Sequence, residues 1–358
     1  MYIEGMYNNL IFSTLFILIS TMLTFAEIPL DLKLDTQYYG RWLIEDSVVR
    51  TSSPGAAIQF SFKGTKVVAE IEGNSYWKVE IDNKEYPSLL TNTRKKYTVV
   101  QGLPAKKHII TLTRKSECVN EEIRVYSILL EAKGMPKQAL SNNRRLEFIG
   151  DSYTVGYGNE ARNSNDGEPF SKTNTTKSFA YLLAKSFKAD FQINAFSGRG
   201  LVKNYGDITP EWTIPKLYEY TIPGVAREGN SPKWNFESWH PQVIVIFVGI
   251  NDWQGKPPYP SAVAFDKAYA ELLSTLRSRH PGVQFLLLAT HVWPLDEMIP
   301  RVQTVFDNEI KNGHKDVTFM IVSTENTALD GHPSIHAHKN LANELRPVIG
   351  RLGKWLSR

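Results

Sequence analysis

The hydrophobic pattern of this chain changes character near residue 140, and that change limits the folds available to it. Between about residues 36 and 134, short segments alternate apolar and polar residues, which is the period of half-buried β-strands. Beyond residue 143, continuous apolar runs alternate with helical stretches. A chain of 358 residues is long enough for two cores, so we expect one domain on each side of a linker over residues 134–143.

The first region is typical of a β-sandwich of jelly-roll type. Turn residues such as Lys63-Gly64 and Asp82-Asn83 separate short strands at near-regular spacing, and no long helical period occurs before residue 140. The expected strands cover residues 57–62, 66–71, 77–82, 96–100 and 108–112. We assign this β-sandwich domain to residues 27–140.

The second region predicts a three-layer αβα domain over residues 141–358. Runs such as 243–248 are apolar throughout, which is typical of parallel strands that helices cover on both faces. The expected strands are 146–149, 191–195, 243–248, 285–289 and 319–322. The expected helices are 179–187, 262–279, 296–311 and 337–355. The fold class is therefore α/β with a parallel sheet, preceded by the β-sandwich.

The N-terminus has the composition of a signal peptide over residues 1–26. Residues 10–25 are apolar and uncharged, and small residues at Thr24 and Ala26 suit cleavage after Ala26, which predicts an extracellular or periplasmic protein. The alternative is a membrane anchor, but the run is short for a span of about 20 residues. Cys118 is the only cysteine, so no intrachain disulfide is possible.

Polar residues follow the expected parallel strands at similar positions. Gly150-Asp151-Ser152 ends the apolar run that begins at Leu146, and Gly150 permits a tight turn there. Three later segments are Ser197-Gly198-Arg199-Gly200, Gly249-Ile250-Asn251-Asp252 and Asp330-Gly331-His332-Pro333. Because active sites of parallel sheets gather at the carboxyl ends of the strands, we expect these segments to meet there.

Together these segments supply the groups that ester hydrolysis requires. Ser152 is the candidate nucleophile, and His332 is the candidate base, with Pro333 placed to open the last helix. Asp330 is the candidate group that orients the imidazole, although a backbone carbonyl is an alternative. Asp151 is expected to orient the turn rather than to act as a catalytic acid.

The oxyanion of the reaction needs hydrogen-bond donors near the serine. The candidates are the Gly198 N–H, the Asn251 side-chain amide and the Ser152 N–H. Gly200 is an alternative to Gly198, and Asn251 has the alternative role of a helix N-cap.

The order of these four segments resembles the SGNH (GDSL-type) hydrolase superfamily from about residue 145 to the C-terminus. More narrowly, a jelly-roll domain followed by the run from Gly150 to Gly158 resembles carbohydrate esterase family 2. The resemblance implies a metal-independent enzyme that removes acetyl groups from plant cell-wall polysaccharides such as xylan and mannan. It assigns Ser152 as nucleophile, His332 as base, and Gly198 and Asn251 as oxyanion donors.

The chain departs from these patterns around the histidine. In the superfamily the acid usually lies three residues before the histidine, whereas Asp330 lies two before it. In family 2 an aromatic residue often stands between the two and lines the sugar site, where this chain has Gly331. These departures leave open which group orients His332 and which sugar is preferred.

Other functions fit the sequence less well. The net charge of +4 is not concentrated in a basic block, so nucleic-acid binding is not indicated. A metal site at His332 and His336 is disfavoured, because Pro333 places His332 outside the last helix. We expect no cofactor, and a monomer that acts on acetylated polysaccharide or oligosaccharide. The alternatives are a lipase or acyl esterase on other esters, and a catalytically silent glycan-binding protein.

Two tryptophans are candidates for contact with a sugar ring. Trp253 follows the Asn-Asp pair, and Trp293 follows the fourth expected parallel strand. Tryptophan rings stack on sugars, but they also fill protein cores. The sequence leaves both interpretations open at each position.

Overall fold

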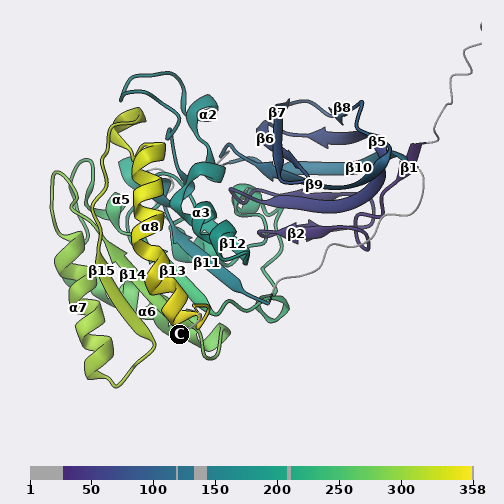
Figure 1. Ribbon diagram of the computed structural model, residues 1–358. Helices are drawn as coiled ribbons and strands as arrows, with labels where there is room; N and C mark the ends of the chain where they lie inside the picture. Colours follow the sequence, from purple (N-terminus) through teal and green to yellow (C-terminus); the bar gives the residue numbers. More distant parts are fainter. Residues whose placement is uncertain (1–26, 118–119, 133–142, 208–210, 357–358) are drawn as a thin grey trace, which may run out of the picture.

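The computed structural model describes residues 27–117, 120–132, 143–207 and 211–356. The expected signal peptide, Cys118 and most of the expected linker lie outside these residues. Within the described part of the chain, no helix combines the length and the apolar character that crossing a bilayer requires. Figure 1 shows an all-β domain beside a domain of mixed helices and strands.

The first domain is an antiparallel β-sandwich, which confirms the expected fold. One hydrogen-bonded path runs in the order β3-β4-β10-β5-β9-β6-β7, while β1 pairs with β10, and β2 and β8 pair with β5. The strands are β1 (Glu27–Pro29), β2 (Gln37–Tyr39), β3 (Leu43–Ile44), β4 (Val49–Thr51), β5 (Ala57–Glu72), β6 (Ser75–Ile81), β7 (Lys84–Thr91), β8 (Lys95–Val100), β9 (Lys106–Arg114) and β10 (Ile123–Ala132).

The turn expected at Lys63-Gly64 is wrong, because β5 runs through it as one strand of 16 residues. Up to Gly64 the strand pairs with β9, and from Gly64 onward it pairs with β10. Gly64 lies where the β10 register shifts, so the glycine marks an irregularity rather than a chain reversal.

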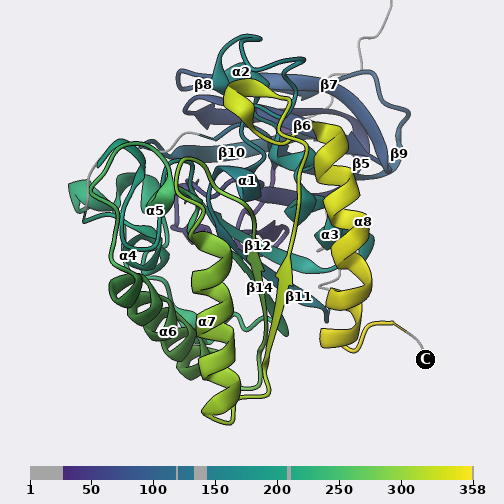
Figure 2. The same cartoon turned by 90° about the vertical axis from the view of Figure 1, so that its left-hand side faces the viewer.

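The second domain is the expected parallel sheet, in the order β12-β11-β13-β14-β15. Helices α3 and α8 cover one face, and α6 and α7 cover the other (Figure 2). The strands are β11 (Arg145–Gly150), β12 (Asp190–Ala195), β13 (Val243–Phe247), β14 (Gln284–Ala289) and β15 (Val317–Ile321). The long helices are α3 (Phe179–Ser186), α6 (Ala262–Arg279), α7 (Met298–Lys311) and α8 (Ile335–Leu352).

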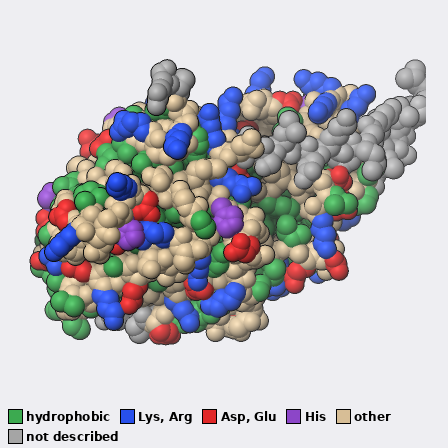
Figure 3. Space-filling model, turned by 90° about the horizontal axis from the view of Figure 1, so that it is seen from below, with side chains coloured by type: hydrophobic (Ala, Val, Ile, Leu, Met, Phe, Trp, Pro, Cys, Tyr) green, Lys and Arg blue, Asp and Glu red, His purple; other side chains and the backbone are tan. Residues whose placement is uncertain are grey.

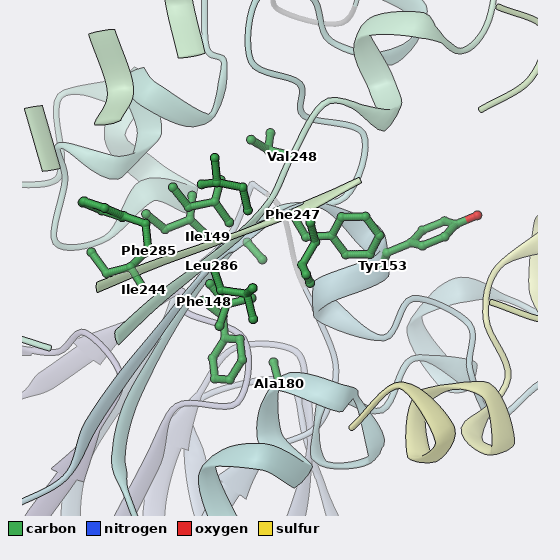
Figure 4. Packing of buried hydrophobic residues seen from close by; sticks show 14 of the residues in the cluster. Phe148, Ile149, Tyr153, Ala180, Ile244, Phe247, Val248, Phe285 and Leu286 are labelled. Atoms are coloured by element: carbon green, nitrogen blue, oxygen red, sulfur yellow. The ribbon is translucent and has the colours of Figure 1, made fainter. Parts of the chain in front are cut away.

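Burial on both faces explains why these strands are mainly apolar, although β11 and β12 also carry the buried polar side chains of Glu147, Gln192 and Asn194. In Figure 4, Phe148 of β11 points toward Ala180 of α3, while its neighbour Ile149 lies on the opposite face of the sheet near Phe285. Both side chains are fully buried. Alternate residues of one strand therefore pack against helices on opposite faces of the sheet, and both sets belong to one hydrophobic core.

The remaining helices of the described residues are short. The α-helical ones are α1 (Ser152–Val155), α2 (Pro169–Lys172), α4 (Ile214–Tyr218) and α5 (Ile250–Trp253). The 3₁₀ turns are η1 (Thr175–Lys177), η2 (Tyr205–Asp207), η3 (Pro223–Glu228), η4 (Phe236–Ser238) and η5 (Leu329–Gly331).

Pro333 does not open the last helix as expected. Helix α8 begins at Ile335, and its N-cap is Ser334, whose hydroxyl accepts a hydrogen bond from the Ala337 N–H at 3.3 Å. The serine side chain satisfies an N–H of the first helical turn, which favours a helix that starts at Ile335.

The two domains are joined by polar contacts that are buried. The Arg41 side chain of the first domain lies fully buried against the second, with Nη2 3.5 Å from a Glu147 carboxylate oxygen and Nε donating to the Gln192 side-chain oxygen at 2.9 Å. Backbone hydrogen bonds also cross the domain boundary, including one from the Gly40 N–H to the Phe191 carbonyl at 2.8 Å.

On the surface, basic and acidic side chains are interspersed on the face that Figure 3 shows.

Candidate active site

Ser152 lies where β11 turns into α1. Asp151 is the N-cap of this helix, and its carboxylate accepts a hydrogen bond from the Tyr153 N–H at 3.1 Å. A Cβ at Gly150 would lie 2.2 Å from the Thr154 hydroxyl and 2.7 Å from the Phe247 carbonyl, so only glycine fits the turn. The turn presents Ser152 to a pocket of about 510 Å³. Asp151 orients the turn, as expected.

His332 faces Ser152 across this pocket. Its Nε2 lies 2.9 Å from Ser152 Oγ, and its Nδ1 lies 3.0 Å from the carbonyl oxygen of Leu329. A carbonyl accepts only, so Nδ1 carries the proton and Nε2 is left to accept from the serine hydroxyl. Burial lowers the pKa of His332, although the Leu329 carbonyl acts in the opposite direction. The imidazole is therefore neutral near pH 7, as a general base must be.

Asp330 does not orient His332, contrary to the expected role. Its carboxylate accepts a hydrogen bond from the Tyr157 hydroxyl at 2.9 Å. Asp330 has a left-handed backbone, with φ of 50°, and this turn brings the carbonyl of Leu329 rather than the Asp330 side chain to Nδ1. The structure thus has the alternative arrangement, a Ser-His pair held by a backbone carbonyl.

Gly198 occupies the third position of a tight turn beside the pocket. The Arg199 N–H donates to the Phe196 carbonyl at 3.2 Å, and Gly198 has φ of 76°. Turns of type II require such a positive φ at this position, which glycine adopts without strain. The central peptide of the turn carries the Gly198 N–H, and the turn's own hydrogen bond does not use it.

Gly200, the alternative donor, is already occupied. Its N–H donates to the Asn204 side-chain oxygen at 3.1 Å. A Cβ there would lie 2.0 Å from the Lys203 carbonyl, so Gly200 serves close packing of the loop. Of the two glycines, Gly198 is the one that lines the pocket.

Asn251 lies within α5 rather than before it, so the N-cap alternative is wrong: Gly249 is the cap residue. One hydrogen of its side-chain amide is donated to the Arg199 carbonyl at 2.9 Å. The amide has a second hydrogen, and the residue lines the pocket with Ser152 and Gly198. Asn251 therefore both anchors the loop that follows Gly198 and offers a donor to the pocket.

The two candidate tryptophans differ in environment. Trp253 is 2% exposed and packs against Phe265 of α6, with ring centroids 5.3 Å apart, so the sugar-contact role is wrong for it. Trp293 lines the pocket and is 82% exposed, which leaves its ring free to meet a ligand. The difference arises because α5 turns Trp253 back onto the sheet-covering helix.

Three residues of the site region were not predicted from the sequence. Tyr157 packs its ring 4.5 Å from that of His332, and Asp252 accepts hydrogen bonds from three successive N–H groups, Leu201, Val202 and Lys203. Some indication of Asp252 was present in the sequence, because this residue adjoins Asn251 just after an expected strand. Glu117 contacts Ser197 from the other domain, and nothing in the local sequence indicates it.

The geometry can perform acyl transfer. A hydroxyl, a neutral imidazole and two N–H donors surround one pocket, which is what attack on an ester carbonyl requires. His336, the other member of the disfavoured metal pair, contacts Asn340 at 3.0 Å instead of facing His332. Over the described residues, no group of three or more potential metal ligands converges.

Two family models match the chain. The model described as "Carbohydrate esterase 2 N-terminal" matches residues 38–138, and the "GDSL-like Lipase/Acylhydrolase family" matches residues 148–313. The interval between the two matches, residues 139–147, lies where the hydrophobic pattern changes.

Individual proteins are similar over both domains. An acetylxylan esterase / glucomannan deacetylase of Cellvibrio japonicus is 28% identical over 328 residues, which cover 86% of this chain and 88% of that protein. Cellulase/esterase CelE of Acetivibrio thermocellus is 27% identical over 89% of this chain but 39% of its own length. The solved structure of a family two carbohydrate esterase from Clostridium thermocellum in complex with cellohexaose has a TM-score of 0.80 at 26% identity, covering 90% of this chain and 100% of that one.

Proposed function

We propose that this chain, which belongs to carbohydrate esterase family 2 of the SGNH hydrolases, removes O-acetyl groups from plant cell-wall polysaccharides. The chain is a carboxylic ester hydrolase, and the similar Cellvibrio japonicus protein is named an acetylxylan esterase / glucomannan deacetylase. The observation that carries the proposal is the 2.9 Å contact between Ser152 Oγ and His332 Nε2 inside the pocket.

The proposed reaction has two halves. Ser152 Oγ attacks the acetyl carbonyl carbon while His332 Nε2 takes the hydroxyl proton, and the negative charge on the carbonyl oxygen is stabilised by the N–H groups of Gly198 and Asn251. The bond between the carbonyl carbon and the sugar oxygen then breaks, and His332 returns the proton to that oxygen. Water attacks the acetyl-Ser152 ester by the same route, releasing acetate. Each oxyanion donor contributes about 2.7–4 kcal/mol to transition-state stabilisation.

The surroundings of the pocket support a sugar ester as substrate. Tyr157, Tyr205 and Trp293 are aromatic residues of its lining, and Asp330 adds a carboxylate that accepts hydrogen bonds. Sugars offer apolar ring faces to aromatic side chains and hydroxyl groups to carboxylates.

The test is acetate release from acetylated xylan and acetylated glucomannan. We expect release by the wild-type protein and a loss of at least about 10³-fold for Ser152→Ala, since removal of the nucleophile leaves only binding and oxyanion stabilisation. Undiminished activity of Ser152→Ala would remove the nucleophile assignment. A series of 4-nitrophenyl esters provides the second arm, in which preference for long acyl chains over acetyl contradicts deacetylation.

We also propose that the protein is secreted, on the composition of residues 1–26. Expression of the full chain in a secreting host should release a protein whose N-terminal residue is Glu27. Edman sequencing of the extracellular fraction checks this, and an intact Met1 on membrane-bound protein would instead indicate an uncleaved anchor.

A further inference from the structure

We propose that Glu117, a residue of the β-sandwich domain, is a positioning residue for the oxyanion donor Gly198 in the other domain. The inference rests on the proposed role of Gly198 in ester hydrolysis. The structural observation is that the carboxylate of Glu117 accepts hydrogen bonds from both the backbone N–H and the hydroxyl of Ser197, the residue before Gly198.

The contact crosses the domain boundary at a specific point. Glu117 follows β9, whereas Ser197 is the second residue of the turn that begins at Phe196. Glu117 Oε1 lies 2.8 Å from the Ser197 nitrogen, and Oε2 contacts Ser197 Oγ. One carboxylate therefore binds two donors of a single residue, and this fixes the orientation of that residue as well as its position.

A contact that holds the backbone of Ser197 in place also orients the Gly198 N–H, because this N–H belongs to the peptide plane that joins the two residues. The peptide that joins them carries the Gly198 N–H, and its direction follows from the φ and ψ angles of Ser197. On the far side of the turn, the Tyr205 N–H donates to the Gly198 carbonyl at 2.8 Å, and Asn251 holds the Arg199 carbonyl at 2.9 Å. The second domain thus anchors one side of the turn, and Glu117 anchors the other.

The charged and polar groups around Glu117 influence the pKa of its carboxyl group. Burial raises the pKa of Glu117, while the two Ser197 hydrogen bonds and the charges of Arg114 and Arg199 act in the opposite direction. Arg114 is fully buried and belongs to the same domain as Glu117, whereas Arg199 belongs to the turn itself. The charges of Arg114 and Arg199 favour the carboxylate form of Glu117, which is the form that accepts both Ser197 hydrogen bonds.

The test compares Glu117→Ala with Glu117→Gln in the hydrolysis of 4-nitrophenyl acetate. We expect Glu117→Ala to lower kcat by about 10- to 100-fold with KM changed by less than about twofold, because a displaced donor is lost only from the transition state. Glu117→Gln keeps an acceptor for the Ser197 N–H and a donor for its hydroxyl oxygen, so it should retain most of the wild-type kcat.

A matched control separates positioning from domain docking. The Ser52 hydroxyl accepts a hydrogen bond from the Gly224 N–H at 3.0 Å, also across the domain boundary but away from the turn. Ser52→Ala should leave kcat within about twofold of wild type. An equal loss in Ser52→Ala and Glu117→Ala would overturn the proposal, as would an unchanged kcat in Glu117→Ala or a loss that appears only in KM.

The small ester keeps this test independent of the polysaccharide assignment. A wild-type protein that hydrolyses 4-nitrophenyl acetate but not acetylated xylan would contradict the proposed substrate and leave the role of Glu117 measurable. Ser197→Ala, which removes only the hydroxyl contact, provides a milder variant in case Glu117→Ala does not fold. The kcat of Ser197→Ala should fall by less than the kcat of Glu117→Ala. An unchanged kcat in Ser197→Ala together with a lowered kcat in Glu117→Gln would contradict positioning through Ser197.

Discussion

The Nδ1 atom of His332 lies 3.0 Å from the carbonyl oxygen of Leu329, a residue of the same loop. A carbonyl oxygen in the backbone has no side-chain freedom and no titration of its own. It therefore fixes one ring orientation of the histidine, and one tautomer as long as the imidazole is neutral. The catalytic pair is oriented by the path of the chain rather than by a third side chain.

The first prediction concerns Asp330. Substitution Asp330→Asn keeps an oxygen that accepts from the Tyr157 hydroxyl, and it leaves the Leu329 carbonyl on His332. We expect kcat on 4-nitrophenyl acetate to fall by less than about tenfold, whereas removal of an acid that orients the histidine in a full triad costs about 10⁴-fold. Steady-state kinetics of the variant beside His332→Ala distinguish the two cases, and a 10⁴-fold loss would restore Asp330 as the orienting acid.

The second prediction is the position of the acid limb in the pH profile. The base must be neutral, and burial lowers the pKa of His332 below its ordinary 6.5. Activity should therefore be lost as the pH falls through a midpoint below 6.5, and kcat/KM should vary little between about pH 7 and 8. Because the negative charge of Asp330 raises the His332 pKa, Asp330→Asn should move the midpoint to still lower pH. A wild-type midpoint above 7 would contradict the neutral, buried imidazole.

Much of this site could be predicted from the sequence because its residues follow apolar strands. The carboxyl ends of β11 and β13 place Ser152 and Asn251 at one edge of the sheet, and a strand pattern alone reveals those ends. Bounds of α6 also agree with the expected 262–279, because its apolar period is long.

What the sequence did not reveal depends on contacts between distant segments. The burial of Trp253 depends on Phe265 in the next helix, and the contact of Glu117 depends on how two domains dock. The turn expected at Lys63-Gly64 failed because a strand that continues through a bulge has the same local composition as a reversal. Local patterns identify elements, but they do not specify which element covers which side chain.

The third prediction concerns Trp293. Its ring is free at the pocket, so Trp293→Ala should raise KM for acetylated polysaccharide by roughly two- to twelvefold, corresponding to about 0.5–1.5 kcal/mol of aromatic stacking. The kinetics of 4-nitrophenyl acetate should change by less than about twofold, because that ester has no sugar ring for the indole to hold. Equal effects on both substrates would argue against a role in holding the sugar.

The fourth prediction concerns the buried contact between the domains. Arg41→Ala leaves the Glu147 carboxylate, the Gln192 side chain and the Tyr218 carbonyl without their guanidinium partner. Loss of one member of a buried ion pair typically costs about 3–5 kcal/mol, and we expect this decrease in the free energy of unfolding by urea titration.

The exposed Lys33–Asp46 pair of the same domain provides the control for that measurement. Lys33→Ala should leave the urea midpoint almost unchanged, because solvent screens the pair. A similar small change for Arg41→Ala would show that water replaces the guanidinium without penalty.

The depth to which Arg41 enters the second domain has a consequence for recombination between relatives. The guanidinium pairs with Glu147 of β11, the strand that leads into Ser152. The second domain therefore contains a buried carboxylate whose counterion lies more than a hundred residues earlier in the chain. A chimera that joins this second half to a β-sandwich domain from another protein should be less stable unless that domain also places a cation beside Glu147. Recombination that transfers both domains together keeps the Arg41–Glu147 pair, whereas a crossover in the linker separates the two residues.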